Sequence, residues 1–295
     1  MRTILHKGVS RLAHLGAFNW MPDKPYIKLI YWARMGKKCN LDHPQTFNEK
    51  LQWLKLYDRK PEYSLLVDKC EVKKYVAEKI GEEYIIPTLG VWDSFEQIDL
   101  GGLPDQFVLK CTHDSGGLVI CRDKSKLDIV AAKKKMTQSL RRNYFLHGRE
   151  WPYKNVKPRI IAEAYMEDGS MQGLRDYKFY VFNGEIKYLY VSQGLENHAT
   201  AKISFLTPEW EFAPFGRSDY KPFEELPIKP KNYDTMKNIV LKLSQGLRFI
   251  RIDLYDICGK VYFSEMTFYP VSGLMPFLPE EFDEVLGEGL CLSES

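Results

Sequence analysis

The residues best suited to chemistry lie near the end of the chain, in residues 247–273. Arg251 and Asp253 alternate with apolar residues, which is typical of a half-buried strand. After a short turn, a second β-rich run carries Glu265 and Thr267. Two carboxylates and a hydroxyl suit Mg²⁺, which takes one or two protein carboxylates and completes its shell with water and phosphate oxygens. Arg251 would neutralise charge on a reacting phosphoryl or carboxylate group.

The number of residues in the hairpin loop decides whether these groups meet. An odd loop places Asp253, Glu265 and Thr267 on the face that carries Arg251. An even loop places Asp253 and Glu265 on opposite faces, unless a β-bulge intervenes. An ordinary hairpin whose charged face meets water remains an alternative.

A second candidate site is a strand that ends in Lys110, followed by a polar loop and another strand. The loop contains His113, Ser115, Gly116 and Gly117. Glycines let backbone N–H groups turn inward and form an anion-binding nest, and a lysine at the strand end adds positive charge. The glycine spacing fits neither a Walker loop nor a dinucleotide-binding fingerprint.

The hairpin ends in EMTFYPVSG, and the string HPQTFNEKLQWLKLYDR precedes the core. With the ordered motifs DK, KCTHDSGG, DYK and RxD, these segments resemble the TupA-like ATP-grasp proteins of cell-surface polysaccharide and teichuronopeptide gene clusters. The resemblance implies an α/β (α+β) ATP-grasp fold with a helical N-terminal extension. It implies four segments: the helical extension (1–66), the N-terminal part of the core (67–105), the lid (106–166) and the C-terminal part with the metal site (167–295).

The same resemblance implies a nucleotide site. Lys69 and Lys110 would reach the ATP phosphates, and the loop with His113, Ser115, Gly116 and Gly117 would cover them. Glu163 and the backbone near Tyr165 would read the adenine edge.

The resemblance also implies the catalytic groups. Asp176 would belong to this nucleotide site, and Lys178, on the same face of its strand, would point to the terminal phosphate. Asp253, Glu265 and Thr267 would hold Mg²⁺, with Arg251 and Lys178 as catalytic residues. Most ATP-grasp enzymes have Asn where this chain has Thr267, and a hydroxyl can also ligate Mg²⁺.

The implied reaction is ATP- and Mg²⁺-dependent carboxylate–amine ligation through an acyl phosphate. In the polysaccharide context the carboxylate would be a uronic acid of a sugar or polymer, and the amine an amino acid. Two alternatives remain. One is a glycosyltransferase, although the chain lacks a short DxD motif for a sugar-nucleotide metal. The other is a catalytically silent module that binds nucleotide or polysaccharide.

Composition is that of an ordinary globular protein of 295 residues, with 44% hydrophobic and 27% charged residues and a net charge of +3. The six cysteines form no CxxC pair, and no signal peptide or membrane-spanning run is evident. We therefore expect free thiols and a cytoplasmic protein that does not bind nucleic acid.

Residues 1–38 carry eight basic residues against one acidic residue, a net charge of +7. Leu5, Val9, Leu12 and Leu15 recur near helical spacing. Such a helix either rests on the inner face of a membrane or on an acidic polymer, or packs on the core with a solvated basic face.

Local signals predict further elements. Thr46 and Glu49 form a capping box before a helix, and Asn183–Gly184 predicts a tight hairpin turn. Ser125 is the expected N-cap of a helix over 125–142. Residues 193–231 show little periodicity, which indicates a functional loop or short strands that the pattern conceals.

Overall fold

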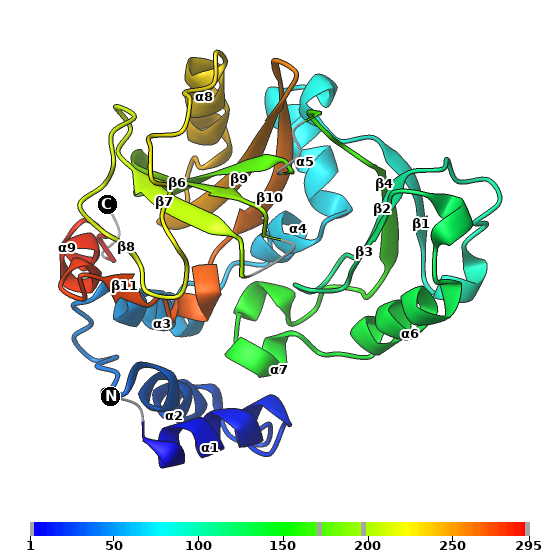
Figure 1. Ribbon diagram of the computed structural model, residues 1–295. Coiled ribbons are helices and arrows are strands. Elements are labelled where there is room, and N and C mark those ends of the chain that lie inside the picture. Colours follow the sequence, from blue (N-terminus) through cyan, green and yellow to red (C-terminus); the bar gives the residue numbers. More distant parts are fainter. Residues whose placement is uncertain (1–2, 170–172, 196–198, 293–295) are drawn as a thin grey trace.

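The computed structural model describes residues 3–169, 173–195 and 199–292. Two antiparallel sheets stand beside each other, with helices around them (Figure 1). This mixed architecture confirms the expected α+β class. The expected division into four segments stays a prediction, and strand β1 (Thr88–Trp92) of the second segment pairs with β4 (Ile160–Ala164) of the third.

The larger sheet has five strands in the order β10-β9-β5-β6-β7. The turn at Asn183–Gly184, with φ of 49° and 85°, confirms the expected hairpin. Strand β7 lies within the aperiodic region, so this region does conceal short strands. The strands are β5 (Arg175–Phe182), β6 (Glu185–Gln193), β7 (Lys202–Leu206), β9 (Phe249–Ile257) and β10 (Lys260–Thr267). A separate pair joins β8 (Gly216–Arg217) to β11 (Phe277–Leu278).

The two faces of this sheet differ. Alternating apolar residues turn one face toward α5 (Glu71–Ile80) and α8 (Tyr233–Leu243), which bury Val76, Met236 and Val240 in the main core. On the other face Phe47, from α3 (Phe47–Tyr57), stacks on Phe182. Helix α9 (Phe282–Glu288) packs against α3. The remaining part of this second face carries the charged candidate residues.

The smaller sheet has the order β1-β4-β2-β3, with β2 (Phe107–Cys111) and β3 (Leu118–Cys121). Helix α6 (Ile129–Leu140) covers one face and builds a separate core with Phe107, Leu109 and Met136. The expected N-cap was wrong: α6 begins after Asp128, whose carboxylate accepts the Ala131 N–H at 2.9 Å. Ser125 lies in a preceding short turn that Asp123 caps.

The N-terminal extension begins with a hairpin of α1 (Ile4–His14) and α2 (Asp23–Met35), which lies below the core in Figure 1. The capping box of Thr46 and Glu49 at α3 is confirmed, with Glu49 N–H donating to Thr46 Oγ1 at 3.2 Å. Helix α1 packs against α2 and buries His6 and Ala13, while Leu5 and Leu12 are exposed.

Short elements complete the chain. The remaining α-helices are α4 (Tyr63–Val67) and α7 (Phe145–Gly148). The 3₁₀ turns are η1 (Glu82–Tyr84), η2 (Phe95–Gln97), η3 (Lys124–Lys126), η4 (Trp151–Tyr153) and η5 (Pro270–Gly273). All six cysteines are free thiols. None of the helices in the described ranges has the length and apolar character needed to cross a bilayer.

Candidate active site

The β9–β10 hairpin brings the two candidate metal carboxylates to one face. Its turn has two residues, Cys258 and Gly259, both with positive φ. This even loop would separate Asp253 from Glu265 in a regular ladder. A β-bulge at Ser264 shifts the register, so that Glu265 stands directly opposite Asp253. The sequence argument allowed Asp253 and Glu265 to share a face across an even loop only if such a β-bulge intervened.

Arg251 lies at the centre of the resulting cluster. Its guanidinium donates to both oxygens of Asp253 at 2.7 Å, to Glu265 Oε1 at 2.9 Å and to Thr267 Oγ1 at 3.0 Å. Asp253 is completely buried. The three residues expected to hold Mg²⁺ therefore share one buried cation.

Lys178 extends the cluster onto the neighbouring strand β5. Its Nζ lies 2.5 Å from Asp253 Oδ2 and 3.4 Å from Asp176 Oδ1. Burial alone would lower the pKa of Lys178, but Asp176 and Asp253 outweigh it and raise the pKa well above its ordinary value. Lys178 is therefore a fixed positive charge. The Oδ1 atom of Asp176 is buried and accepts no hydrogen bond from the described residues.

Glu265 is the carboxylate of the cluster that solvent reaches. Burial alone would raise its pKa, but Arg251, Lys178 and Lys69 outweigh burial and lower the pKa to about 2. Its side chain is 41% exposed. Within the described residues its second oxygen, Oε2, has no hydrogen-bond donor. Glu265 thus presents an ionised oxygen to the opening of the site.

This donor set fits Mg²⁺ in its usual protein environment. Two carboxylates and a hydroxyl converge, and Glu265 and Asp176 each retain an oxygen without a hydrogen bond. Across the described ranges, no group of three or more His, Cys, Asp or Glu side chains forms a closed metal cage. Mg²⁺ rarely uses such a cage, because it keeps waters and takes phosphate oxygens from its substrate. Asp253, Glu265 and Thr267 are the residues that would hold it.

The glycine loop lies against Lys69. The Lys69 ammonium donates to the carbonyl oxygen of Asp114, and its backbone N–H donates to the Thr112 carbonyl at 3.1 Å. Gly116 has a φ of +107°, which favours glycine. A Cβ on Gly117 would come 2.4 Å from Ser139 Oγ, so helix α6 also requires a glycine here.

The other loop residues differ in exposure. Ser115 is exposed, and its hydroxyl interacts with Tyr144. His113 is buried, and its Nε2 lies 3.2 Å from the Arg142 carbonyl oxygen. Burial lowers the pKa of His113, so it is neutral near pH 7. Its expected role at the nucleotide stays a prediction.

Glu163 on β4 joins two lysines. Its carboxylate pairs with Lys110 at 2.5 Å and also with Lys73. Burial alone would raise the pKa of Glu163, but the two ammonium groups outweigh it and lower the pKa. The adenine role of Glu163 stays a prediction. Tyr165, just beyond β4, accepts a hydrogen bond from Arg122 Nε at 3.0 Å.

Sequence reasoning missed several residues of this region. Lys73 sits in an ordinary amphipathic helix, and nothing local marks it as a partner of Glu163. Arg217, in the aperiodic region, has a nearly buried side chain and pairs with Asp219 at 2.7 Å. Its charge, with that of Arg251, acts on Tyr180, a buried tyrosine on the face of the sheet that carries Arg251.

Comparison with known proteins gives three findings. A sequence profile described as TupA-like ATPgrasp matches residues 49–291. A search of curated protein sequences gave no match. Solved structures resemble the fold at low identity.

Among these is a D-alanine–D-alanine ligase from Bacillus anthracis complexed with ATP, at 14% identity and a TM-score of 0.42, covering 69% of this chain and 55% of that chain. A D-alanyl-alanine synthetase A from Vibrio cholerae is 14% identical with a TM-score of 0.46, covering 78% of this chain and 63% of that chain. The ATP-grasp ligase PsnB, complexed with a precursor variant, Mg and ADP, is 9% identical with a TM-score of 0.42, covering 83% of this chain and 58% of that chain. The chain thus spans little more than half the length of the first of these structures.

Arg251→Met tests the charge cluster. Removing the guanidinium leaves Asp253 and Glu265 facing each other with Lys178 as the nearest ammonium. Loss of one partner from a buried ion pair costs about 3–5 kcal/mol in free energy of unfolding. Urea denaturation in the presence of EDTA measures this loss in free energy of unfolding. The control Arg11→Met, on the exposed surface of α1, is expected to change stability by less than about 0.5 kcal/mol. Equal stability of both variants would contradict the network.

Proposed function

This chain belongs to the TupA-like ATP-grasp family, and from that membership we propose that it is an ATP- and Mg²⁺-dependent carboxylate–amine ligase. The observation that carries the proposal is the convergence of Lys178, Arg251, Asp253 and Glu265 on one face of the larger sheet. Lys69, at the glycine loop, acts electrostatically on the same Glu265.

The reaction has two steps. A carboxylate is a poor electrophile, so one carboxylate oxygen first attacks the γ-phosphorus of ATP, forming an acyl phosphate and releasing ADP. The amine then attacks the acyl carbon, phosphate leaves with the bonding electrons, and the nitrogen loses a proton. The product is an amide.

The residues of this chain contribute positioning and charge. Lys69, Lys110 and the glycine loop hold the phosphates, and Glu163 with the backbone at Tyr165 meets the adenine. Asp176 orients Lys178 toward the terminal phosphate. Arg251 stabilises negative charge on the phosphoryl group and on the acyl phosphate. Bound Mg²⁺ would supply a further positive charge to the phosphates.

The substrates follow from the family setting. We propose a uronic acid, in a sugar or polysaccharide, as the carboxylate and an amino acid as the amine. ADP release that requires both substrates would support the ligase. Transfer from a sugar nucleotide without ADP release would support a glycosyltransferase instead, and ATP binding without turnover would support a silent binding module.

Nucleotide binding is expected to raise the melting temperature. A ligand that binds only the folded state stabilises it by mass action. Mg²⁺ and ATP together should shift the melting temperature of the wild type, and Lys110→Ala should remove most of the shift. Lys74→Ala, an exposed lysine on α5, is the matched control and should leave the shift unchanged. An undiminished shift in Lys110→Ala would exclude the phosphate role.

Arg251→Met also tests the metal set. Without the guanidinium, Mg²⁺ can neutralise the facing carboxylates of Asp253 and Glu265, so Mg²⁺ alone should recover part of the lost stability. Thermal melts with and without Mg²⁺ measure this recovery. Arg217→Met, which removes a guanidinium paired with Asp219, should gain nothing from Mg²⁺. An equal response of the two variants would place the metal elsewhere.

Glu265→Gln separates catalysis from binding. It keeps volume and hydrogen bonding but removes the charge that would hold Mg²⁺. Turnover, measured as ADP release with a uronate and pooled amino acids, should fall about a hundredfold or more. ATP affinity should change little, because the lysines still hold the nucleotide. A variant that turns over like the wild type would contradict the metal assignment.

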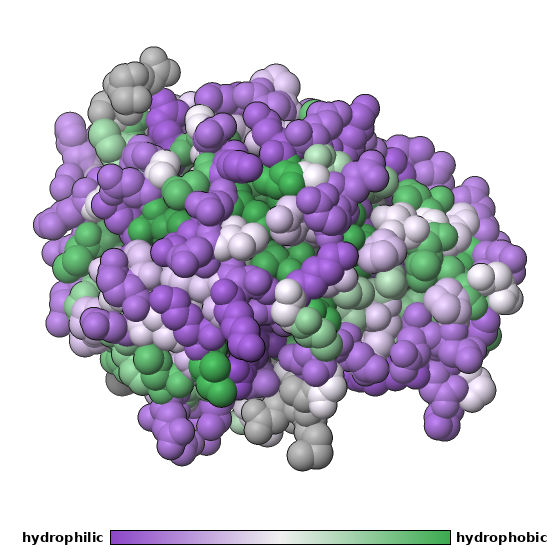
Figure 2. All heavy atoms as spheres, turned by 90° about the horizontal axis from the view of Figure 1, so that it is seen from above, coloured by the Kyte–Doolittle hydropathy of each residue, from purple (hydrophilic) through white to green (hydrophobic). Residues whose placement is uncertain are grey.

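We propose that α1 docks on an anionic membrane surface, at the cytoplasmic face where ATP is available. Ile4, Leu12 and Leu15 are exposed and lie within about 100° of the helix circumference, at 3.6 residues per turn. Exposed Lys7 and Arg11 border this stripe. An apolar stripe edged by basic residues suits the headgroup boundary of anionic lipids. The opposite face of the molecule is mostly hydrophilic, with separate apolar patches (Figure 2).

Vesicle binding tests this surface. Binding to phosphatidylglycerol vesicles should weaken as salt rises, whereas neutral phosphatidylcholine vesicles should bind little. Replacing Leu12 and Leu15 by Ser should reduce partitioning about tenfold or more for each side chain. Leu226→Ser, an exposed leucine outside α1, is the control. Vesicle binding that changes neither with salt concentration nor on replacement of Leu12 and Leu15 would exclude docking through α1.

A further inference from the structure

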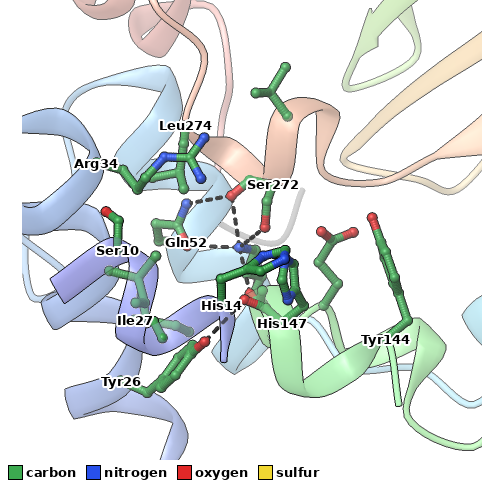
Figure 3. A pocket seen from close by; sticks show the side chains of 16 residues that line it. Ser10, His14, Tyr26, Ile27, Arg34, Gln52, Tyr144, His147, Ser272 and Leu274 are labelled. Carbon is green, nitrogen blue, oxygen red and sulfur yellow. Dashed lines mark hydrogen bonds between the residues drawn. The ribbon is translucent and has the colours of Figure 1, made fainter. Parts of the chain in front are cut away.

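A cavity of about 100 Å³ lies between the N-terminal hairpin and the core. Figure 3 shows that its walls come from three parts of the chain: Ser10, His14 and Arg34 from α1 and α2, Tyr144 and His147 at α7, and Ser272 from the turn η5. The family match begins at residue 49. The wall formed by α1 and α2 therefore lies outside the residues that the family profile matches.

Glu150 is an acidic group of this cavity. It is 5% exposed, and burial raises its pKa, an effect that Lys55 and the Ser272 hydroxyl only reduce. In the described part of the chain no ammonium or guanidinium lies within 4 Å of its carboxylate. A buried carboxylate without a contacting cation is costly. A positively charged group of a ligand would offset that cost.

Lys55 cannot serve as that cation. Its ammonium donates to Gln52 Oε1 at 3.0 Å, to the Gly148 carbonyl at 2.8 Å, and to the carbonyl and hydroxyl oxygens of Ser272 at 2.8 and 3.0 Å. An ammonium has three N–H donors, so these four acceptors occupy all of them. Burial lowers the pKa of Lys55 to about 8. Lys55 lines the cavity, but its ammonium does not pair with Glu150. The Glu150 carboxylate can therefore pair with a cation of a bound ligand.

The opposite side of the cavity is basic. His14 Nδ1 lies 3.1 Å from His147 Nε2, and the two rings meet edge to face. Arg34 contributes a guanidinium from α2. Burial lowers the pKa of His147, and His14, Arg142 and Arg34 lower it further. A ligand anion on this side would meet the positive charge of Arg34 and the N–H groups of the histidines.

Tyr144 lines the cavity and also lies within electrostatic range of Glu265 in the catalytic cluster. The Glu150 carboxylate is the largest cause that raises the pKa of Tyr144, followed by burial and then Glu265. The hydroxyl of Tyr144 also interacts with Ser115 of the glycine loop. Tyr144 therefore lies between the cavity, the glycine loop and the catalytic carboxylates.

We propose that this cavity binds the amine substrate as a small zwitterionic amino acid, with its ammonium group at Glu150 and its carboxylate toward Arg34 and the His14–His147 pair. The inference rests on the proposed ligase function and assigns a binding site to its amino acid. A volume of about 100 Å³ suits an amino acid with a small side chain.

Calorimetric titration of the full chain, saturated with Mg²⁺ and ADP, tests the proposal. The probes are glycine, both enantiomers of alanine and serine, acetate and methylamine. At least one amino acid should bind, while acetate and methylamine, which each offer one charge, should bind at least tenfold more weakly. Glu150→Gln should weaken amino-acid binding about ten- to a hundredfold, the effect of losing a charge-assisted hydrogen bond. Glu78→Gln, an exposed glutamate on α5, should bind like the wild type.

A second variant keeps the test informative if Glu150→Gln does not fold. Ser10→Leu extends an apolar side chain into the cavity and should abolish amino-acid binding. Gly8→Leu, which adds the same side chain to the exposed surface of α1, should not affect it.

The proposal and the ligase function fail separately. ATP binding by the wild type with no binding of any amino acid overturns the cavity assignment alone. Equal binding of acetate, or amino-acid binding unchanged in Glu150→Gln or Ser10→Leu, also overturns it. A wild type that binds no ATP overturns the proposed function.

Discussion

One extra residue in strand β10 decides which side chains meet. Without the bulge at Ser264, the two-residue turn would place Ser264 opposite Asp253 and turn Glu265 toward the buried face of the sheet. Arg251 would then lose one of its two carboxylate partners, and Thr267 would turn away with Glu265. The contacts of Glu265 and Thr267 with Arg251 depend on this local departure from a regular ladder.

The positive groups of the site are held in advance by carboxylates. Arg251 and Lys178 meet Asp253, while Lys110 meets Glu163 on the smaller sheet. Buried cations without partners would be expensive, so the protein supplies its own anions where phosphates are expected to bind. Phosphate oxygens would enter a site whose basic side chains are already oriented, which reduces the entropy lost on binding.

The sequence predicted features whose causes are local. The capping box at Thr46, the turn at Asn183–Gly184 and the two strands of the β9–β10 hairpin all depend on neighbouring residues. The sequence left open whether a bulge occurs in β10, because strand register depends on what packs against each face of the sheet. The N-cap at Ser125 was wrong because Asp128 offers the same chemistry one turn later.

The other features that the sequence did not predict depend on contacts between residues far apart in the chain. Periodicity showed that α1 is amphipathic but not which face packs, and its leucines proved to be exposed. Nothing in the local sequence marks Lys55 as buried, because its acceptors at Gly148 and Ser272 are far along the chain. The resemblance named residues for the nucleotide and the metal, and their roles stay predictions. The fold brings the metal residues together around Arg251.

The separate cores of the two sheets have a thermodynamic consequence. The core under the smaller sheet shares no residue with the main core among the described residues. The two parts are joined by polar contacts, such as those of Arg159 with Asp68 and Glu71 at 3.0 and 2.8 Å. A rotation of one sheet against the other that leaves both cores intact would break these ion pairs and keep the residues of each core buried. Its heat-capacity change would therefore be small, and ionic strength would shift its equilibrium more than temperature.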